Sequence, residues 1–147
     1  MQIPDINILV YAHREECQEY AAYHQWFSEL VTSGRPFGLT PLVAVGFVRV
    51  VTQPKFPGGP TPVSQALACM DLLREQPGCA WLSPGPRHWE IVSSFCRQTS
   101  AVGKAIADAQ HAAVALEHQG IWCTRDTDFM RFKPHGLNLN LLNLTRT

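Results

Sequence analysis

The chain has 147 residues, and its 12 Lys and Arg balance its 12 Asp and Glu, so its formal net charge is zero. Its 46% hydrophobic and 16% charged residues exclude a disordered chain, and its length fits a single domain spanning residues 1–147. A neutral chain has no overall attraction to nucleic acid, so RNA or DNA binding would need a local basic surface.

The five cysteines form no CxxC pair, and the six histidines form no zinc-ligand pattern. The N-terminus lacks a basic region followed by a long apolar run, which argues against a signal peptide. The most apolar stretch, PLVAVGFVRVV, is too short to cross a bilayer. We therefore expect a soluble, cytoplasmic protein that makes no use of a membrane.

The first half of the chain predicts short strands and longer helices. Apolar spacing places strands at residues 3–6 and 37–39, and helices at residues 7–11, 18–32 and 42–52. Thr40 and Pro41 suit the N-cap and the first position of the third helix, which is apolar on nearly every side and should be buried. A Pro- and Gly-rich loop follows at residues 54–62.

The second half repeats this alternation. Helices are predicted at residues 63–74 and 102–119, and a turn followed by a helix at residues 83–98. Strands are predicted at residues 79–82 and 121–124, a turn with a short helix at residues 125–132, and a last strand or tail at residues 137–144. Strands that alternate with helices are typical of the α/β class. We predict a small parallel sheet of four to five strands, flanked by helices on both faces.

Acidic residues follow two of these strands. Asp5 ends the first strand, while Asp126 and Asp128 come after the fourth strand, whose last residue is Thr124. Asp108 lies near the start of the helix that precedes the fourth strand. Ligands of parallel α/β sheets bind beyond the carboxyl ends of the strands, so we expect these acids to converge there.

Each acid also has a local interpretation that the sequence leaves open. Asp5 could cap the following helix, Asp108 could pair with Lys104 four residues before it, and the last two acids could serve the turn. If they do converge, two carboxylates about 5 Å apart repel by roughly 3 kcal/mol at an effective dielectric near 20. A divalent cation removes this repulsion, and an all-oxygen ligand set favours Mg²⁺, with Mn²⁺ as an alternative. This pattern favours metal-dependent hydrolysis of a phosphodiester.

The stretches PDINILVYA, FGLTPLVAVGFVRVVTQP, GPRHWE, IADAQHAAVALEHQ and CTRDTDF resemble the PIN-domain ribonucleases, and more narrowly the VapC toxins of bacterial toxin–antitoxin pairs. The resemblance runs in order from about residue 3 to about residue 133. It implies a PIN-like three-layer α/β/α fold and a magnesium-dependent endoribonuclease acting on structured RNA such as tRNA or rRNA. It also implies a cognate antitoxin that blocks the site, and a homodimer.

The resemblance assigns roles by position. It implies that Asp5 and Asp108 hold one ion, directly or through water, and that Asp126 orients the water that attacks phosphorus. Asn7, Thr124 and Asp128 match secondary positions of the site.

Basic and aromatic side chains are candidates for contacting RNA. Lys104 and Arg125 flank the acids in sequence, and the other basic candidates are Arg14, Arg49, Arg87, Arg131 and Lys133. Ordinary surface charge is the open alternative for all of them. For the aromatic residues, core packing is favoured over stacking on bases; they are Trp81, Trp89, Trp122 and Phe129.

One position departs from the family pattern. Most members carry a glutamate in the central helix where this chain has Gly46, which weakens the case for a second ion and suggests tight packing or extra space. Glu90 is a candidate substitute. A catalytically silent PIN-like module that binds RNA or a protein is therefore the alternative function. A haloacid-dehalogenase-like phosphatase ranks lower, because that chemistry needs a second aspartate where Asn7 stands.

Overall fold

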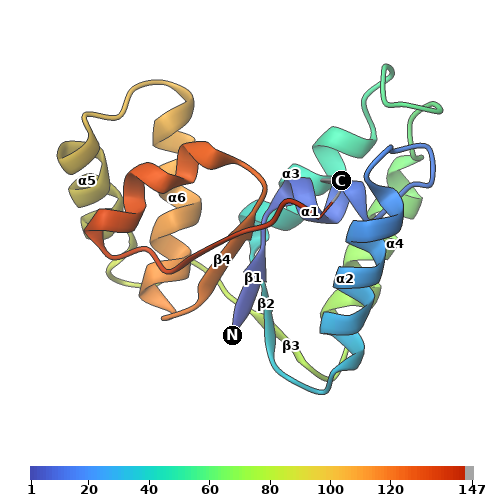
Figure 1. The fold of residues 1–147 in the computed structure, drawn as a ribbon, viewed down its shortest axis with the longest axis horizontal. Helices are drawn as coiled ribbons and strands as arrows, with labels where there is room; N and C mark the ends of the chain where they lie inside the picture. The colour runs from blue at the N-terminus through green and yellow to red at the C-terminus, as the bar shows by residue number, and fades with distance from the viewer. Residues whose placement is uncertain (145–147) are drawn as a thin grey trace.

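A five-stranded sheet organises the molecule, which the computed structural model describes over residues 1–144 (Figure 1). Residues 145–147 of the predicted domain lie outside the described residues. The strand order is β3-β2-β1-β4-β5, and every neighbouring pair is parallel. The strands are β1 (Gln2–Pro4), β2 (Phe37–Leu39), β3 (Cys79–Trp81), β4 (Ile121–Thr124) and β5 (Leu139–Leu141).

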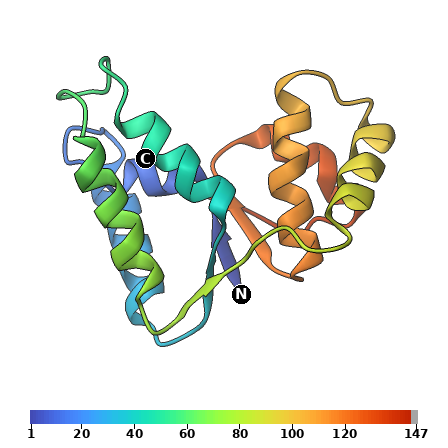
Figure 2. The same ribbon diagram turned by 180° about the vertical axis from the view of Figure 1, so that it is seen from behind.

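Helices connect the strands and flank the sheet, as expected for parallel connections. They are α1 (Ile6–Tyr11), α2 (Tyr20–Thr32), α3 (Pro41–Val51), α4 (Val63–Arg74), α5 (His88–Thr99), α6 (Lys104–Glu117) and the 3₁₀ helix η1 (Thr127–His135). Both views show α2 and α4 on one side of the strands and α5, α6 and η1 on the other (Figures 1 and 2). The predicted three-layer α/β/α class is therefore confirmed.

The three central strands, β1, β2 and β4, are short and almost completely buried, whereas the edge strands β3 and β5 are partly exposed. Ile3 and Trp122 are paired across β1 and β4, and both are 0% exposed. Phe37 and Leu39 extend the core through β2. Burial on both faces explains why these strands are uninterrupted apolar runs rather than alternating sequences.

The first strand is shorter than predicted. We placed it at residues 3–6, but it ends at Pro4, and Ile6 is the first residue of α1. The reason is Asp5, whose side chain accepts a hydrogen bond from the N–H of Ile6 at 2.6 Å and caps the helix. The predicted cap at Thr40 is confirmed, since its hydroxyl accepts the N–H of Val43 at 3.0 Å.

Gly46 marks a close contact between α1 and α3. A Cβ at this position would lie 2.9 Å from Cγ1 of Ile6 and nearer still to its Cδ1. Of the two explanations offered for this glycine, tight packing is therefore correct, because Ile6 fills the space that a side chain would need.

The aromatic predictions hold for two residues and fail for two. Trp122 and Phe129 are buried in the core, whereas Trp81 and Trp89 are 39% and 78% exposed. Trp81 lies on the edge strand β3, where the guanidinium of Arg74 stacks 4.0 Å from its ring centre. Within residues 1–144, no helix has the length and apolar character needed to span a membrane.

Candidate active site

The site lies where the strand order changes direction. From the central β1 the chain moves outward to β2 and β3, and later returns to β4 on the other side of β1. The loops that leave β1 and β4 therefore diverge and leave a crevice beyond the carboxyl ends of both strands. Asp5 follows β1 at this point, and Thr124 ends β4.

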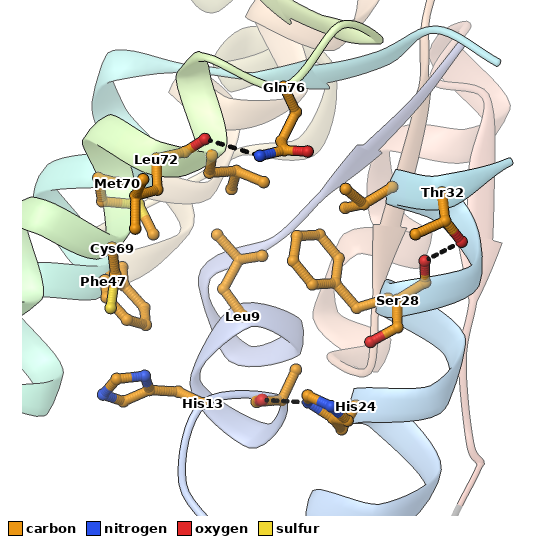
Figure 3. Close-up of a pocket in the computed structure, with 14 residues that line it drawn as sticks. Leu9, His13, His24, Ser28, Thr32, Phe47, Cys69, Met70, Leu72 and Gln76 are labelled. Atoms are coloured by element: carbon orange, nitrogen blue, oxygen red, sulfur yellow. Dashed lines mark hydrogen bonds between the residues drawn. The ribbon is translucent and has the colours of Figure 1, made fainter. Parts of the chain in front are cut away.

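Two pockets differ in the kind of side chain that lines them. A pocket of about 400 Å³ between α2 and α4 is lined by apolar side chains such as Leu9, Phe27 and Met70, with His13 and His24 at one end (Figure 3). Among residues 1–144, no Asp or Glu lines this pocket. The second pocket, of about 460 Å³, lies at the switch point and is lined by the carboxylates of Asp5, Asp108 and Asp126.

The Thr124 hydroxyl connects the two strand ends. It donates a hydrogen bond to Oδ2 of Asp5 at 2.6 Å, and it accepts hydrogen bonds from the Asn7 amide at 3.3 Å and the Asp126 N–H at 3.0 Å. Asp5 is 6% exposed and its other oxygen caps α1. The local capping interpretation and the convergence interpretation of Asp5 therefore both hold.

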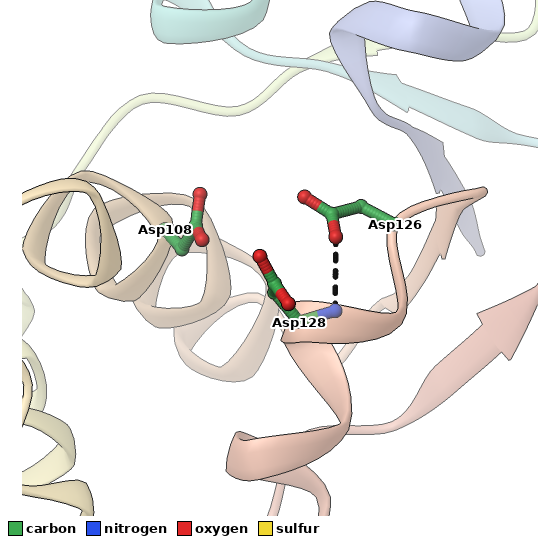
Figure 4. Close-up of side chains that lie close together, drawn as sticks. All are labelled: Asp108, Asp126 and Asp128. Atoms are coloured by element: carbon green, nitrogen blue, oxygen red, sulfur yellow. Dashed lines mark hydrogen bonds between the residues drawn. The ribbon is translucent and has the colours of Figure 1, made fainter.

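A tight acidic group forms between α6 and the loop after β4 (Figure 4). One oxygen from each of Asp108, Asp126 and Asp128 lies within 4.8 Å of the others. The Asp128 N–H donates to Asp126 at 2.9 Å. The Lys104 ammonium lies 3.2 Å from an oxygen of Asp108, 3.0 Å from one of Asp126 and 3.7 Å from one of Asp128. The predicted Lys104–Asp108 pair is therefore also present.

Burial and mutual repulsion shape the charges of this site. Burial raises the pKa of Asp5 to about 6, and the nearby carboxylates of Asp108 and Asp126 add to the rise. Burial also raises the pKa of Asp108, although Lys104 opposes this. For Asp126, burial is outweighed by the hydrogen bond from Asp128 and by Lys104, so its pKa lies below the ordinary value. Ionising all the carboxyl groups of this site together is therefore unfavourable.

The donor set fits a hard divalent cation. It offers only oxygen atoms, from the residue after β1, from α6 and from the start of η1, and the repulsion between its carboxylates is the kind that such a cation relieves. The tightest group comprises Asp108, Asp126 and Asp128 rather than the predicted pair of Asp5 and Asp108. Asp5 lines the same pocket, and its role as a ligand stays a prediction.

Comparison with known proteins identifies the family. A model of the PIN domain matches residues 3–133. The chain belongs to the PIN-domain family. The VapC ribonuclease Mb2897 of Mycobacterium bovis is 39% identical over 129 residues, which cover 88% of each chain. Ribonuclease VapC25 of Mycobacterium tuberculosis is 33% identical over 132 residues, which cover 90% of this chain and 93% of that protein.

Solved structures share the fold of this PIN domain. The crystal structure of VapBC2 from Rickettsia felis, bound to a DNA fragment from its promoter, matches with a TM-score of 0.69 and 14% identity over 97% of this chain and 98% of that one. The structure of FitAB bound to an IR36 DNA fragment matches with a TM-score of 0.68 and 16% identity over 99% and 100% of the two chains. At this level of identity the likeness extends to the fold alone.

The basic residues of this PIN domain are not equally available for RNA. Arg125 pairs with Glu19 at 3.2 Å and lies 5.2 Å from the ring centre of Tyr11, so it links the loop after β4 to α1 and α2. Arg49 is exposed, lines the acidic pocket from α3 and has no ion pair within residues 1–144. Of these two, Arg49 is therefore the better placed to contact a substrate.

Glu90 does not replace the missing family glutamate of this PIN domain. It lies on α5 beside Arg87, 3.6 Å away, and both side chains are exposed. It does not line the acidic pocket. The geometry instead places Glu90 on a solvent-exposed face of α5.

Two lining residues of the pocket with polar side chains were not identified in the sequence analysis. Tyr11 lines it from the end of α1, and His111 lines it from α6. The His111 ring stacks on Trp122 with 5.3 Å between ring centres, and burial lowers its pKa to about 4. A signal for His111 was its position three residues after Asp108, which places both side chains on the same side of a helix.

Proposed function

We propose that this protein is a metal-dependent endoribonuclease and the toxin of a toxin–antitoxin pair. The observation that carries the proposal is the convergence of Asp5, Asp108 and Asp126 on one pocket at the switch point of a PIN domain. Its relatives, matched over most of both chains, are VapC ribonucleases.

The residues of the pocket have separate tasks in this proposal. Asp5 and Asp108 hold Mg²⁺, or Mn²⁺, which when bound supplies positive charge to orient a phosphodiester and stabilise the leaving oxygen. Asp126, whose pKa is low, is the ionised carboxylate that orients the attacking water and accepts its proton. Thr124 fixes Asp5 and the backbone of Asp126 relative to each other. Asn7 holds the Thr124 hydroxyl, and Asp128 completes the acidic group.

Substrate contacts come from both sides of the pocket. Arg49 on α3 and Lys104 on α6 line it together, so a phosphate backbone that crosses the acids passes between two basic residues. This arrangement suits RNA despite the zero net charge of the chain. We propose a structured RNA such as tRNA or rRNA as the substrate and the cytoplasm as the place of action.

A protein partner belongs to the same proposal. The similar structures are those of VapBC2 and FitAB, each with bound DNA. By analogy, we propose that this chain pairs with an antitoxin that blocks the acidic pocket and that it forms a homodimer.

A catalytically silent RNA- or protein-binding module is the second candidate. The observation that favours it is Gly46, which offers no carboxylate and is packed against Ile6. The retained acids favour the enzyme.

Cleavage of a fluorescent RNA separates these functions. The wild type with Mg²⁺ is compared with Asp5→Asn, Asp108→Asn and a control, Asp71→Asn, which changes an exposed carboxylate on α4. We expect the two pocket variants to lose at least about 100-fold in rate, in line with the loss of a positioned metal or its ligands, and the control to keep the wild-type rate. Equal residual cleavage in all four proteins would discredit the enzyme and leave the binding module.

A further inference from the structure

Lys104 contacts all three carboxylates of the acidic group formed by Asp108, Asp126 and Asp128. Its ammonium contacts Asp108 four residues along the same helix, and it also contacts Asp126, the N-cap of η1, and Asp128 in the first turn of η1. One side chain therefore pairs with carboxylates from two separate segments. These are the carboxylates that form the tightest potential cation-binding group within residues 1–144.

The Lys104 ammonium stays at this position only because the carboxylates attract it. It is the first residue of α6, directly after Gly103, and a positive charge at a helix N-terminus is opposed by the helix dipole. Its side chain is 67% exposed, so most of its surface faces solvent. The attraction that keeps the ammonium over the pocket is that of the three carboxylates.

We propose that Lys104 competes with the divalent cation for these carboxylates and so sets the affinity of the site for metal. The inference rests on the proposed metal-dependent function. An ammonium and a metal ion cannot both sit among carboxylate oxygens within 4.8 Å of one another without strong repulsion. Metal binding therefore releases the Lys104 side chain toward solvent, where the helix dipole also favours it.

Metal affinity provides the first test. Mn²⁺ binding is measured without RNA, from the loss of the free-ion EPR signal, for the wild type, Lys104→Met, Lys104→Arg and Arg49→Met. Arg49→Met is the matched control, because it removes one positive charge that lines the same pocket without contacting the acids. We expect Lys104→Met to bind Mn²⁺ about three- to tenfold more tightly, since exposed ion pairs are individually weak but three are lost together. Lys104→Arg and Arg49→Met should stay within about twofold of the wild type.

Chemical labelling of the wild-type protein provides the second test and needs no variant. The chain has three lysines, and Lys55 and Lys133 serve as internal references for Lys104. The extent of acylation at each lysine is read by mass spectrometry at increasing Mn²⁺. We expect labelling of Lys104 to rise relative to the two references, with a midpoint at the Mn²⁺ dissociation constant.

The outcomes separate the inference from the function on which it rests. Equal Mn²⁺ affinity in the wild type and Lys104→Met, or an equal gain in Arg49→Met, overturns the inference and leaves the metal-dependent function intact. Labelling of Lys104 that does not respond to bound Mn²⁺ also overturns it. If Mn²⁺ binds to none of the four proteins, the metal-dependent function fails together with the inference.

Discussion

Replacing Asp5 by Asn should make the protein more stable while removing its proposed activity. Asp5 is 6% exposed, and its pKa of about 6, against an ordinary value of 3.8, means that the folded state resists its ionisation. Asn keeps the shape of the side chain and is as good a helix N-cap as Asp, so the cap on α1 should persist. With its one oxygen on the cap, the new amide donates to the Thr124 hydroxyl, which then gives up the longest of its hydrogen bonds, the one from the Asn7 amide at 3.3 Å.

The magnitude follows from the pKa of Asp5. A rise from 3.8 to about 6 corresponds to about 3 kcal/mol of differential stability, at 1.36 kcal/mol per pKa unit. Because the folded pKa lies above the unfolded one, the folded state binds the extra proton between these values. Stability therefore falls as pH rises from about 4 to about 7. We expect the advantage of Asp5→Asn over the wild type to grow by about 2 kcal/mol between pH 4.5 and pH 7.5.

Urea unfolding at the two pH values, with EDTA present, measures this advantage. The control is Asp71→Asn, whose exposed carboxylate should leave stability within about 0.5 kcal/mol of the wild type at both pH values. Adding Mn²⁺ should stabilise the wild type and not Asp5→Asn, if Asp5 is a ligand. The reasoning is refuted if Asp5→Asn is less stable than the wild type at pH 7.5, or if its advantage is the same at pH 4.5.

Three further substitutions test the packing that supports the site, each by urea unfolding. Gly46→Ala should lower the free energy of unfolding by about 1–2 kcal/mol despite the better helix propensity of alanine, because the new Cβ meets Ile6. Adding Ile6→Val should restore part of this loss. A gain in stability for Gly46→Ala would contradict the close contact. Glu117→Ala should cost about 1 kcal/mol, because this carboxylate accepts two backbone N–H groups of the loop before α5, at 2.8 and 2.9 Å. Tyr23→Phe should cost about 1–2 kcal/mol, because the hydroxyl donates to the buried carbonyl of Leu142 at 3.2 Å; an unchanged midpoint would show that this bond is dispensable.

The fold and the location of the site could be predicted from the sequence because they depend on local patterns and on topology. Strands 37–39 and 121–124 and the helix 63–74 lie at the residues predicted, since apolar runs and periodic helices are bounded there by Gly and Pro. The convergence of distant acids followed from one rule about parallel sheets. The rule needs only the order of strands and helices, not side-chain contacts.

The remaining features depend on contacts between residues distant in sequence. The first strand was predicted too long because Ile6 continues its apolar run, whereas the capping bond of Asp5 places Ile6 in a helix. Nothing in the sequence pairs Arg125 with Glu19, because the two residues lie 106 positions apart along the chain. Likewise, the sequence gives no reason to expect Asp128 rather than Asp5 in the tightest acidic group, because the turn that carries Asp128 is folded by the Asp126 side chain.

The residue whose burial destabilises the fold also makes hydrogen bonds that hold the site together. Asp5 is buried at a penalty of about 3 kcal/mol at neutral pH, yet its two oxygens cap α1 and receive the Thr124 hydroxyl, which joins the ends of β1 and β4. A misplaced Thr124 would therefore disturb the sheet ends and the acids together. Such coupling keeps the acids at fixed positions although they repel, and fixed repelling oxygens are what gives a divalent cation its binding energy. If Asp5 is a metal ligand as proposed, bound metal should offset the free-energy cost of its burial.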